Sequence, residues 1–354
     1  MKIAIVGAGF FGTAIALQLK NSQNQIDLYE KENDILQNAS KKNQFRFHLG
    51  YHYPRSQNTF DELKKSKKLF SKFYTEKVFN KTKNYYAISN KDSKITLTEF
   101  LGFVNKNNLF INQTKEKYNK KFTSKFFLTK EKNLNYFNFK KKVFGKLKSA
   151  KINIFTNSAF KKKQIQNYDK IIVCCYANNN SVLYSLGIKN LPKLKYELVE
   201  KIIVKLPRVY KNKSYIILDG NFACLDPYLG TDYHLLSDVK NSKLEIVHSK
   251  FPLFNNIKKN YLKNNDLVDN IRISNFKKFI KNTKKYLPFI SKSKYIGSYY
   301  VTRVLSLNSN SKNKDERLSH IKLHNKKIIS VLAGKWNTCI LASKEIKKLI
   351  HNEK

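Results

Sequence analysis

The sequence predicts an α/β protein in which a doubly wound, mostly parallel domain is built from discontinuous segments and carries an antiparallel, β-rich (α+β) second domain. Three observations support this fold class. An apolar strand pattern at Lys2–Val6 leads through a glycine-rich turn into a helical segment. Buried-strand patterns recur late in the chain, at Lys170–Tyr176 and Lys327–Leu332. Much of the region between these two strands alternates apolar and polar residues, as antiparallel strands do.

The individual elements follow from periodicity and flanking residues. Helices are predicted at Thr13–Leu19, Thr59–Phe79, Leu97–Val104, Phe139–Leu147, Leu267–Tyr286 and Thr338–Ile350. Strands are predicted at Lys2–Val6, Gln25–Glu30, Lys151–Phe155, Lys170–Tyr176, Lys193–Leu206, Tyr215–Leu225, Tyr233–Leu236, Leu244–His248 and Lys327–Leu332, with further short strands within 84–137. This order assigns residues 1–83, 138–190 and 292–354 to the doubly wound domain, and residues 84–137 and 191–291 to the β-rich domain.

The chain has 354 residues, enough for a sizeable core, and its charge is strongly positive. Its 69 Lys and Arg residues outnumber 25 Asp and Glu residues, which gives a formal net charge of +44. Such a charge suits a nucleic-acid or anionic-membrane binder. The lysines are spread along the whole chain, however, and the composition is rich in residues that A/T-rich codons serve. We therefore expect no specific nucleic-acid partner, and peripheral membrane contact stays open.

Cysteines and hydropathy bear on metal binding and on the compartment. Cys174, Cys175, Cys224 and Cys339 form no CxxC pair, so we expect no metal site and a reduced, cytoplasmic compartment. The uncharged run Ile3–Leu19 has the hydropathy of a signal or membrane segment, but its closely spaced glycines argue against both. No other run approaches membrane-spanning length, and a protein without a transmembrane segment is expected.

The segment Gly7–Gly12 matches G-x-G-x-x-G between a strand and a helix, and Glu30 ends the next strand. Gly7 allows the tight turn, Gly9 lets a pyrophosphate approach the backbone, and Gly12 lets the helix pack closely. The helix N-terminus offers N–H groups to phosphates, and Glu30 can accept hydrogen bonds from a ribose. This context predicts a Rossmann-like dinucleotide site, which includes Phe10, Phe11 and Lys31. The motif alone leaves NAD and FAD open, while an acidic strand end disfavours NADP.

Four further segments favour FAD. They are Arg46–Ser56 (RFHLGYHYPRS), Asp169–Ser181 (DKIIVCCYANNNS), Asp219–Pro227 (DGNFACLDP) and Val331–Thr338 (VLAGKWNT). On these residues the chain resembles the D-amino-acid-oxidase-like superfamily of FAD-dependent oxidoreductases, which includes glycerol-3-phosphate dehydrogenase, 2-hydroxyglutarate oxidase and glycine oxidase. The resemblance spans nearly the whole chain. It departs at Tyr176–Asn178, where a glycine is usual, and at Ala333, where a second glycine is common.

The resemblance implies which residues hold FAD. Those along the pyrophosphate, the ribityl chain and the isoalloxazine ring would be Ser40, Asn43, Gln44, Arg46, His48, Tyr176 and Ala177. Those that begin the last helix, with its N-terminus toward the flavin N1/C2=O edge, would be Gly334, Lys335, Trp336, Asn337 and Thr338. A reduced flavin carries negative charge at N1, which helix N–H groups and Lys335 would stabilise.

The resemblance also implies hydride transfer to flavin N5 from a substrate carbon that bears –OH or –NH. His48 is the first catalytic candidate, as a proton acceptor at the flavin face, with a structural histidine as the alternative. Arg303 is the second, because a guanidinium suits a carboxylate or phosphate, with a surface ion pair as the alternative. Tyr53 is the third, with core packing as the alternative. Arg317, within Asp315–Arg317, is expected in a surface cluster.

The sequence thus predicts a cytoplasmic FAD-dependent oxidoreductase that acts on a small, anionic substrate and uses an electron acceptor that stays unknown. Two alternatives stay open. One is a flavin-dependent non-redox sugar transformation or tRNA modification, and the other is a basic, non-enzymatic binding protein on a nucleotide fold. Glu197 and Glu200 lie three apart in a predicted strand and point to opposite faces, so we expect no paired-carboxylate site.

Overall fold

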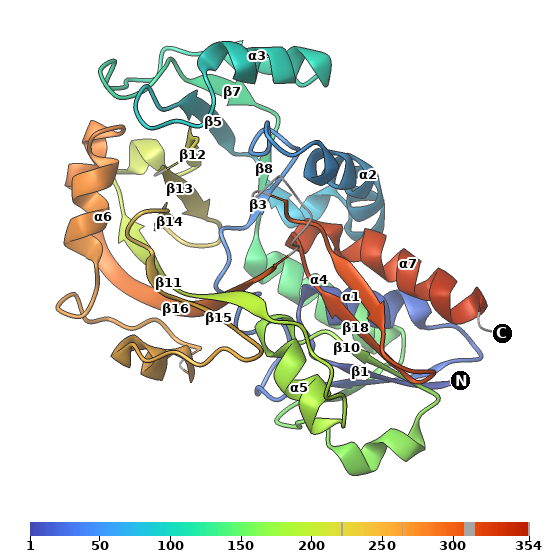
Figure 1. The fold of residues 1–354 in the computed structure, drawn as a ribbon. Coiled ribbons are helices and arrows are strands. Elements are labelled where there is room, and N and C mark those ends of the chain that lie inside the picture. Colours follow the sequence, from blue (N-terminus) through green and yellow to red (C-terminus); the bar gives the residue numbers. More distant parts are fainter. Residues whose placement is uncertain (221, 264, 308–315, 353–354) are drawn as a thin grey trace.

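The protein is described by a computed structural model over residues 1–220, 222–263, 265–307 and 316–352 (Figure 1). Its first sheet has six strands in the order β17-β18-β10-β1-β2-β9 and is parallel except between β17 and β18. The strands are β1 (Lys2–Val6), β2 (Gln25–Tyr29), β9 (Asn153–Phe155), β10 (Lys170–Val173), β17 (His320–Leu323) and β18 (Ile328–Leu332). Strands β2 and β9 are added on one side of β1, and β10 and β18 on the other, so the sheet is doubly wound.

Helices cover both faces of the six-stranded sheet. Because strand residues alternate, Ile5 belongs to the core on one face and Val6 to the core on the other. The core around Ile5 is shared with α1 (Phe10–Leu19), α4 (Tyr136–Ser149) and α7 (Cys339–Asn352). The core around Val6 includes Leu183 of α5 (Asn179–Ser185). The first sheet therefore has the layered arrangement of a dinucleotide-binding domain.

The second sheet has nine strands and is antiparallel except between β5 and β12. Its two longest strands, β11 and β16, pair along their whole length. The other edge of β11 pairs with β14 over one part and with β15 over another. The strands are β5 (Lys83–Ile88), β6 (Ile111–Gln113), β7 (Phe127–Thr129), β11 (Leu194–Lys205), β12 (Lys213–Leu218), β13 (Ala223–Tyr228), β14 (Tyr233–Asp238), β15 (Lys243–Ser249) and β16 (Lys294–Ser306).

The two faces of the nine-stranded sheet have different neighbours. One face carries Ile202 and packs on a core that includes Phe279 of α6 (Phe276–Thr283). The opposite face carries Ile203 and Tyr299, which belong to the same core as α1, α4 and α7. We call this second side, the one with Ile203 and Tyr299, the inner face. Side chains on the inner face are directed toward the doubly wound domain.

A small sheet and a long helix complete this core. The small sheet contains β3 (Arg46–Phe47), β4 (Phe79–Asn80) and β8 (Lys132–Leu134). The helix α2 (Gln57–Tyr74) begins where the side chain of Ser56 accepts a hydrogen bond from the amide of Thr59, an N-cap contact. It lies beside α7, as Figure 1 shows, whereas α3 (Leu97–Lys106) lies at the far end of the β-rich region.

The predicted fold class is confirmed, and most predicted elements are present with shifted ends. Three predictions of elements are wrong. The stretch Tyr215–Leu225 forms two strands, because the chain turns at Gly220, whose φ of +127° favours glycine. Residues 267–275 are not helical, because Val268 pairs with Ser298 of β16. Helix α2 ends at Tyr74, and Phe79 belongs to a strand.

Strand β16 is an element that the sequence did not reveal. It pairs with β11 in the β-rich sheet, although the predicted boundary assigned residues 292–354 to the doubly wound domain. Its mixed run of tyrosines, small residues and Arg303 lacks the strict alternation of a half-buried strand, since both of its faces are covered. Over the described residues, the helices are too short or too polar to cross a lipid bilayer.

Candidate active site

A glycine cradle forms where β1 ends and α1 begins. Gly7 has a φ of +101°, in the left-handed region. A Cβ atom on Gly12 would lie 1.8 Å from the carbonyl oxygen of Gly7, and one on Gly9 would lie 3.0 Å from Ser40 Oγ. Ser40 Oγ also accepts a hydrogen bond of 3.3 Å from the amide of Phe10. The glycines thus allow α1 to start directly against the strand, and its first-turn N–H groups form an anion site.

Glu30 lies directly after β2, beside this cradle. Its carboxylate accepts hydrogen bonds from the amides of Ala8 at 2.8 Å and Glu32 at 3.1 Å. Burial raises the pKa of Glu30. Each oxygen keeps acceptor capacity for a ribose hydroxyl. Lys31 is exposed and pairs with Glu32 at 3.4 Å, while Phe11 is buried in the core beneath α1.

The turn after β10 keeps a backbone conformation that glycine favours without containing glycine. Tyr176 has a φ of +51°, and Ala177 after it is buried. Asn179 joins the turn to β18 by donating a 2.8 Å hydrogen bond to the carbonyl of Val331. The hydroxyl of Tyr176 accepts a hydrogen bond of 3.3 Å from the amide of Val304 in β16. The tyrosine that replaces the usual glycine therefore connects the two large sheets.

The segment with Asn43 and Gln44 crosses from the doubly wound domain to the inner face. Asn43 Oδ1 accepts a 3.1 Å hydrogen bond from the amide of Phe45. Gln44 Nε2 donates a 2.6 Å hydrogen bond to Ser237 Oγ in β14. The Oε1 atom of Gln44 is buried without a partner among the described residues. Since Nε2 is engaged by Ser237, Oε1 is the atom of Gln44 that remains available for the predicted cofactor contact.

Arg46 is bound by the inner face. Its guanidinium donates to both oxygens of Asp226 in β13, Nε at 3.1 Å and Nη2 at 2.6 Å. Both side chains are almost fully buried, and Asp226 raises the pKa of Arg46 against the effect of burial. Ser214 and Asn133 also donate to Asp226 Oδ1. The Arg46 side chain, predicted along the flavin, is thus engaged in an ion pair that joins β3 to the β-rich sheet.

The connection between β18 and α7 is held against the chain that enters β17. A Cβ atom on Gly334 would lie 2.1 Å from the carbonyl oxygen of Arg317, so this close approach requires glycine. The amide of Gly334 donates to Ser319 Oγ at 3.3 Å, and Ser319 Oγ lies 2.9 Å from Thr338 Oγ1. These contacts fix the position at which the last helix begins.

Three segments that are distant in sequence meet at this helix start. Asn337 Nδ2 donates a 3.1 Å hydrogen bond to the carbonyl of His48. The Nζ atom of Lys335 lies 4.9 Å from the ring centroid of Tyr53, in a cation–π contact. The ring of Trp336 packs against those of Phe10, Phe47 and Phe70. The glycine cradle, the His48 segment and the C-terminal segment therefore form one site.

Several buried polar atoms at this junction have no hydrogen-bond partner in the part of the chain that the structure describes. They are Gln44 Oε1, His48 Nδ1, His52 Nδ1, Tyr53 Oη, Trp336 Nε1 and Asn337 Oδ1. Leaving such atoms unpaired costs about 1–3 kcal/mol each. A polar ring system with amide-like edges, such as the isoalloxazine of FAD, offers the donors and acceptors that this set lacks. Together with the glycine cradle, these atoms fit FAD.

Burial favours the neutral forms of His48, Tyr53 and Lys335 near the junction. Burial and the charges of Lys335 and Arg46 lower the pKa of His48 well below 6.5, so its imidazole is neutral at pH 7. Burial raises the pKa of Tyr53, so its phenol stays protonated. The pKa of Lys335 is also lowered far below its usual value, by burial and then by Arg317 and Arg303. The junction thus disfavours additional positive charge.

Arg303 lies on the inner face and is paired. Its Nε donates to Glu197 Oε2 at 2.6 Å across the β11–β16 pair, and Nη2 also contacts Glu197. Lys195 and Lys243 lie 3.3 and 3.9 Å from the same carboxylate. These cations lower the pKa of Glu197. Glu200 is bound on the other face of the sheet by Ser298, which agrees with the prediction that the two glutamates do not form a pair.

Sequence reasoning missed two cations of this region. Arg317 was expected in a surface cluster, but its positive charge acts on Lys335, and its own pKa is lowered by burial. Its amide donates to Thr59 Oγ1 at 3.0 Å, while Asp315, expected beside it, lies outside the described residues. Lys201 of β11 was not singled out at all. Its position four residues after Glu197, on the same face of one strand, is the signal that could have revealed it.

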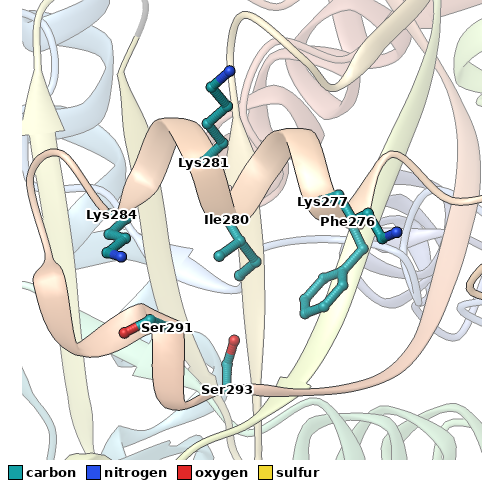
Figure 2. Close-up of a pocket in the computed structure, with 7 residues that line it drawn as sticks. All are labelled: Phe276, Lys277, Ile280, Lys281, Lys284, Ser291 and Ser293. Atoms are coloured by element: carbon teal, nitrogen blue, oxygen red, sulfur yellow. The ribbon is translucent and has the colours of Figure 1, made fainter.

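A separate groove lies away from these residues. Figure 2 shows the residues that line it along α6. Its volume is about 380 Å³. It is lined by Phe276, Lys277, Ile280, Lys281, Lys284, Ser291 and Ser293. Helix α6 covers the face of the β-rich sheet opposite the inner face, so the groove is not part of the site.

The cradle, the acidic strand end and the facing β-rich sheet define a dinucleotide-binding protein with a second domain over the dinucleotide site. A family profile described as FAD dependent oxidoreductase (DAO) matches residues 2–213. The chain belongs to this family, and FAD is its cofactor. This result agrees with the resemblance found in the sequence and with the unpaired polar atoms at the junction.

Solved structures share the whole fold at low sequence identity. Glycine oxidase from Geobacillus kaustophilus aligns with a TM-score of 0.74 and 11% identity, over 99% of this chain and 94% of that one. L-alpha-glycerophosphate oxidase from Mycoplasma pneumoniae, solved with FAD bound, aligns with a TM-score of 0.72 and 16% identity, over 99% and 94%. These likenesses support the fold and its two-domain arrangement.

Curated relatives match a shorter part of the chain. The FAD-dependent monooxygenase kojA of Aspergillus flavus is 34% identical over 93 residues, which are 26% of this chain and 22% of that protein. The FAD-dependent monooxygenase FPY4 of Fusarium mangiferae is 33% identical over 91 residues, 26% of this chain and 25% of that protein. The matched part is thus about a quarter of the length of these relatives.

Proposed function

We propose that this protein oxidises a small anionic substrate by moving a hydride from a carbon that bears –OH or –NH to FAD. The observation that carries this proposal is the gathering of Arg303, Arg317 and Lys335 at one junction, with Glu197 as the nearby carboxylate. Burial, and then the positive charge of Arg303, lowers the pKa of both Lys335 and Arg317, so positive charges repel one another at this junction. An anion bound among them would relieve this repulsion.

The chain's own residues would bind and orient this substrate. When bound, FAD supplies the hydride acceptor, N5 of its isoalloxazine ring. Arg303, on the inner face, is suited to hold a carboxylate or phosphate by the guanidinium N–H groups that its pair with Glu197 does not use. Lys335 and the N-terminus of the last helix would stabilise negative charge on the reduced cofactor. His48 and Tyr53 are neutral groups that complete the wall of the site.

The first test measures whether the protein holds FAD and whether a substrate reduces it. Purified protein should be yellow, and its flavin absorption band should bleach without oxygen when one member of a panel of hydroxy acids, amino acids and phosphorylated alcohols is added. A colourless preparation that cannot be reconstituted with FAD would contradict the proposal and favour a basic, non-enzymatic binding protein. A yellow protein that none of these compounds reduces would favour a non-redox reaction.

The second test measures whether Arg303 binds the anionic group of the substrate. Arg303→Gln should raise KM for the reducing substrate by roughly tenfold or more, because a charge-assisted hydrogen bond contributes about 1.5–3 kcal/mol. The matched control is Arg208→Gln, since Arg208 is exposed and lies outside the site. Equal KM values for the two variants would show that Arg303 does not bind the substrate.

The names of the curated relatives favour a second candidate, monooxygenation, in which one oxygen atom of O2 enters the product. Turnover under isotopically labelled O2 separates the two reactions. Label in the organic product would support monooxygenation, whereas label in hydrogen peroxide alone, or turnover with another electron acceptor, would support substrate dehydrogenation.

A further inference from the structure

Lys201 projects from the inner face toward the cation-rich junction. It is paired in register with Tyr299 of β16 and lies two residues before Ile203, and both of these neighbours belong to the core shared with the doubly wound domain. Glu197, the partner of Arg303, stands four residues earlier on the same face. The lysine is partly buried in the middle of a strand whose flanking residues are fully buried. Its position is therefore set by two well-packed strands.

The ammonium group of Lys201 lacks a counterion. Among the described residues, no hydrogen-bond or ion-pair partner of its Nζ is found. Asp226 is the carboxylate that acts on it electrostatically, but Asp226 is already bound by Arg46, Ser214 and Asn133. Glu197 is likewise engaged by Arg303. Burial therefore disfavours the charged form of Lys201, and no direct ion pair among the described residues offsets this desolvation cost.

The groups that surround Lys201 favour its neutral form. The charged and titratable groups near it are Arg303 and Tyr299 of β16, Asp226 of β13, which opposes this effect, and Lys335 before α7. Burial and then the charge of Arg303 lower the pKa of Lys201 to about 7, while Asp226 acts in the opposite direction. An unprotonated amine with a free lone pair is therefore present near neutral pH, at the face that meets the flavin domain.

We propose that Lys201 is the proton acceptor of this site, and this inference rests on the proposed oxidation. As the C–H bond of the substrate breaks and its hydride leaves for FAD, the O–H or N–H bond on the same carbon breaks and its proton goes to Nζ of Lys201. The substrate becomes a carbonyl or imine, the hydride would be accepted by bound FAD, and the lysine becomes an ammonium ion. Charge is conserved, because the hydride and the proton leave together.

Lys201 is better suited to this role than His48. A proton acceptor works best when the pKa of its conjugate acid lies near the working pH. Burial and then the charges of Lys335 and Arg46 lower the pKa of His48 well below 6.5, so its protonated form is disfavoured. The ammonium of Lys201, in contrast, would gain the anionic substrate and the negative reduced cofactor as partners. His48 is instead held at the site through its backbone carbonyl, which accepts the hydrogen bond from Asn337.

The test compares two substitutions that separate a proton acceptor from a cation that only attracts the substrate. Lys201→Met removes both the amine and the charge, whereas Lys201→Arg keeps a positive charge but cannot accept a proton at neutral pH. We expect both variants to bind FAD and to lose about 100-fold or more in the rate of anaerobic flavin reduction. Lys205→Met, an exposed position on the same strand, is the control and should match the wild type.

A second readout does not depend on turnover. Reductive methylation of the FAD-loaded protein with isotopically labelled formaldehyde gives each lysine an NMR signal that reports its protonation. Signals with a lowered pKa should include those of Lys42 and Lys335, and one further signal should titrate near pH 7 and be absent from both Lys201 variants. The reduction rate of the wild type should rise with pH through the same value, because the free amine is the active form.

Two results would overturn the assignment of Lys201 while leaving the proposed function intact. One is a Lys201→Arg variant that is reduced as fast as the wild type with the same pH profile. The other is a wild-type spectrum in which no signal that titrates near neutral pH disappears in the Lys201 variants. Failure of the wild type to be reduced by any substrate would instead count against the proposed oxidation. Thermal unfolding and the flavin spectrum of each variant identify substitutions that merely disturb folding.

Discussion

The side-chain amide of Asn337 donates a hydrogen bond of 3.1 Å to the backbone carbonyl of His48, across 289 residues of sequence. Both residues are buried, and the carbonyl of Asn337 in turn accepts a hydrogen bond from Ser66 in α2. The start of the last helix is thereby tied to the segment that carries His48 and Tyr53. This bond holds the two halves of the predicted flavin site in register.

Asn337→Ala should therefore destabilise the protein and weaken FAD retention. The substitution leaves the carbonyl of His48 buried without its donor, which costs about 1–3 kcal/mol. The free energy of unfolding in denaturant and the flavin content after gel filtration measure both effects. Asn112→Ala, at an exposed strand position, is the control and should change neither quantity. Full flavin content in Asn337→Ala would show that the junction does not depend on this bond.

Gly12→Ala should abolish or strongly reduce FAD binding. The new Cβ atom would lie 1.8 Å from the carbonyl oxygen of Gly7, so α1 must move away from β1 and carry the phosphate-binding amides with it. Flavin content after reconstitution of the variant measures the loss. Gly102→Ala, in α3, is the matched control because a Cβ there meets no atom within 4 Å. The control should bind FAD normally and gain about 0.5–1 kcal/mol of stability.

Asp226→Ala should destabilise the protein by about 3–5 kcal/mol, because it leaves the buried guanidinium of Arg46 without its carboxylate. The double variant Arg46→Met with Asp226→Leu should be more stable than Asp226→Ala, since it removes both charges and restores apolar packing. Denaturant unfolding of the wild type, the single variant and the double variant gives the comparison. A double variant that is less stable than the single one would show that Arg46 has a further anionic partner.

The sequence revealed those parts of the site whose signals are local. The Gly7–Gly12 motif, Glu30 and the C-terminal Gly334–Thr338 segment were predicted because turns, strand ends and helix starts are encoded by neighbouring residues. The partners of Gln44 and Arg46 were not predicted. They depend on which strand of the β-rich sheet lies opposite β3, and this is a matter of tertiary packing.

The cations of the inner face were partly missed for the same reason. Arg317 follows acidic residues in the sequence, a pattern typical of a solvated surface, yet the chain brings it near Lys335. Lys201 is one of many lysines in a chain with a net charge of +44, so its residue type carried no signal. Only the register of β11 with β16 separates it from exposed lysines such as Lys205.

Lys201 should also give the protein a pH-dependent stability that its removal abolishes. In the unfolded chain the pKa of a lysine is about 10.4, whereas in the folded protein that of Lys201 is lowered to about 7. Between these two values the unfolded state binds more protons, so the stability of the wild type rises with pH across this window. Below about pH 7 the full cost of the buried charge is present.

Lys201→Met should consequently be more stable than the wild type at about pH 6, and this advantage should shrink steadily as the pH rises toward about 10. Denaturant unfolding of the FAD-loaded proteins at several pH values measures the difference. Lys205→Met should show no such trend, because Lys205 is exposed. A difference between Lys201→Met and wild type that is independent of pH would mean that Lys201 keeps an ordinary pKa, and its role as a proton acceptor would lose its physical basis.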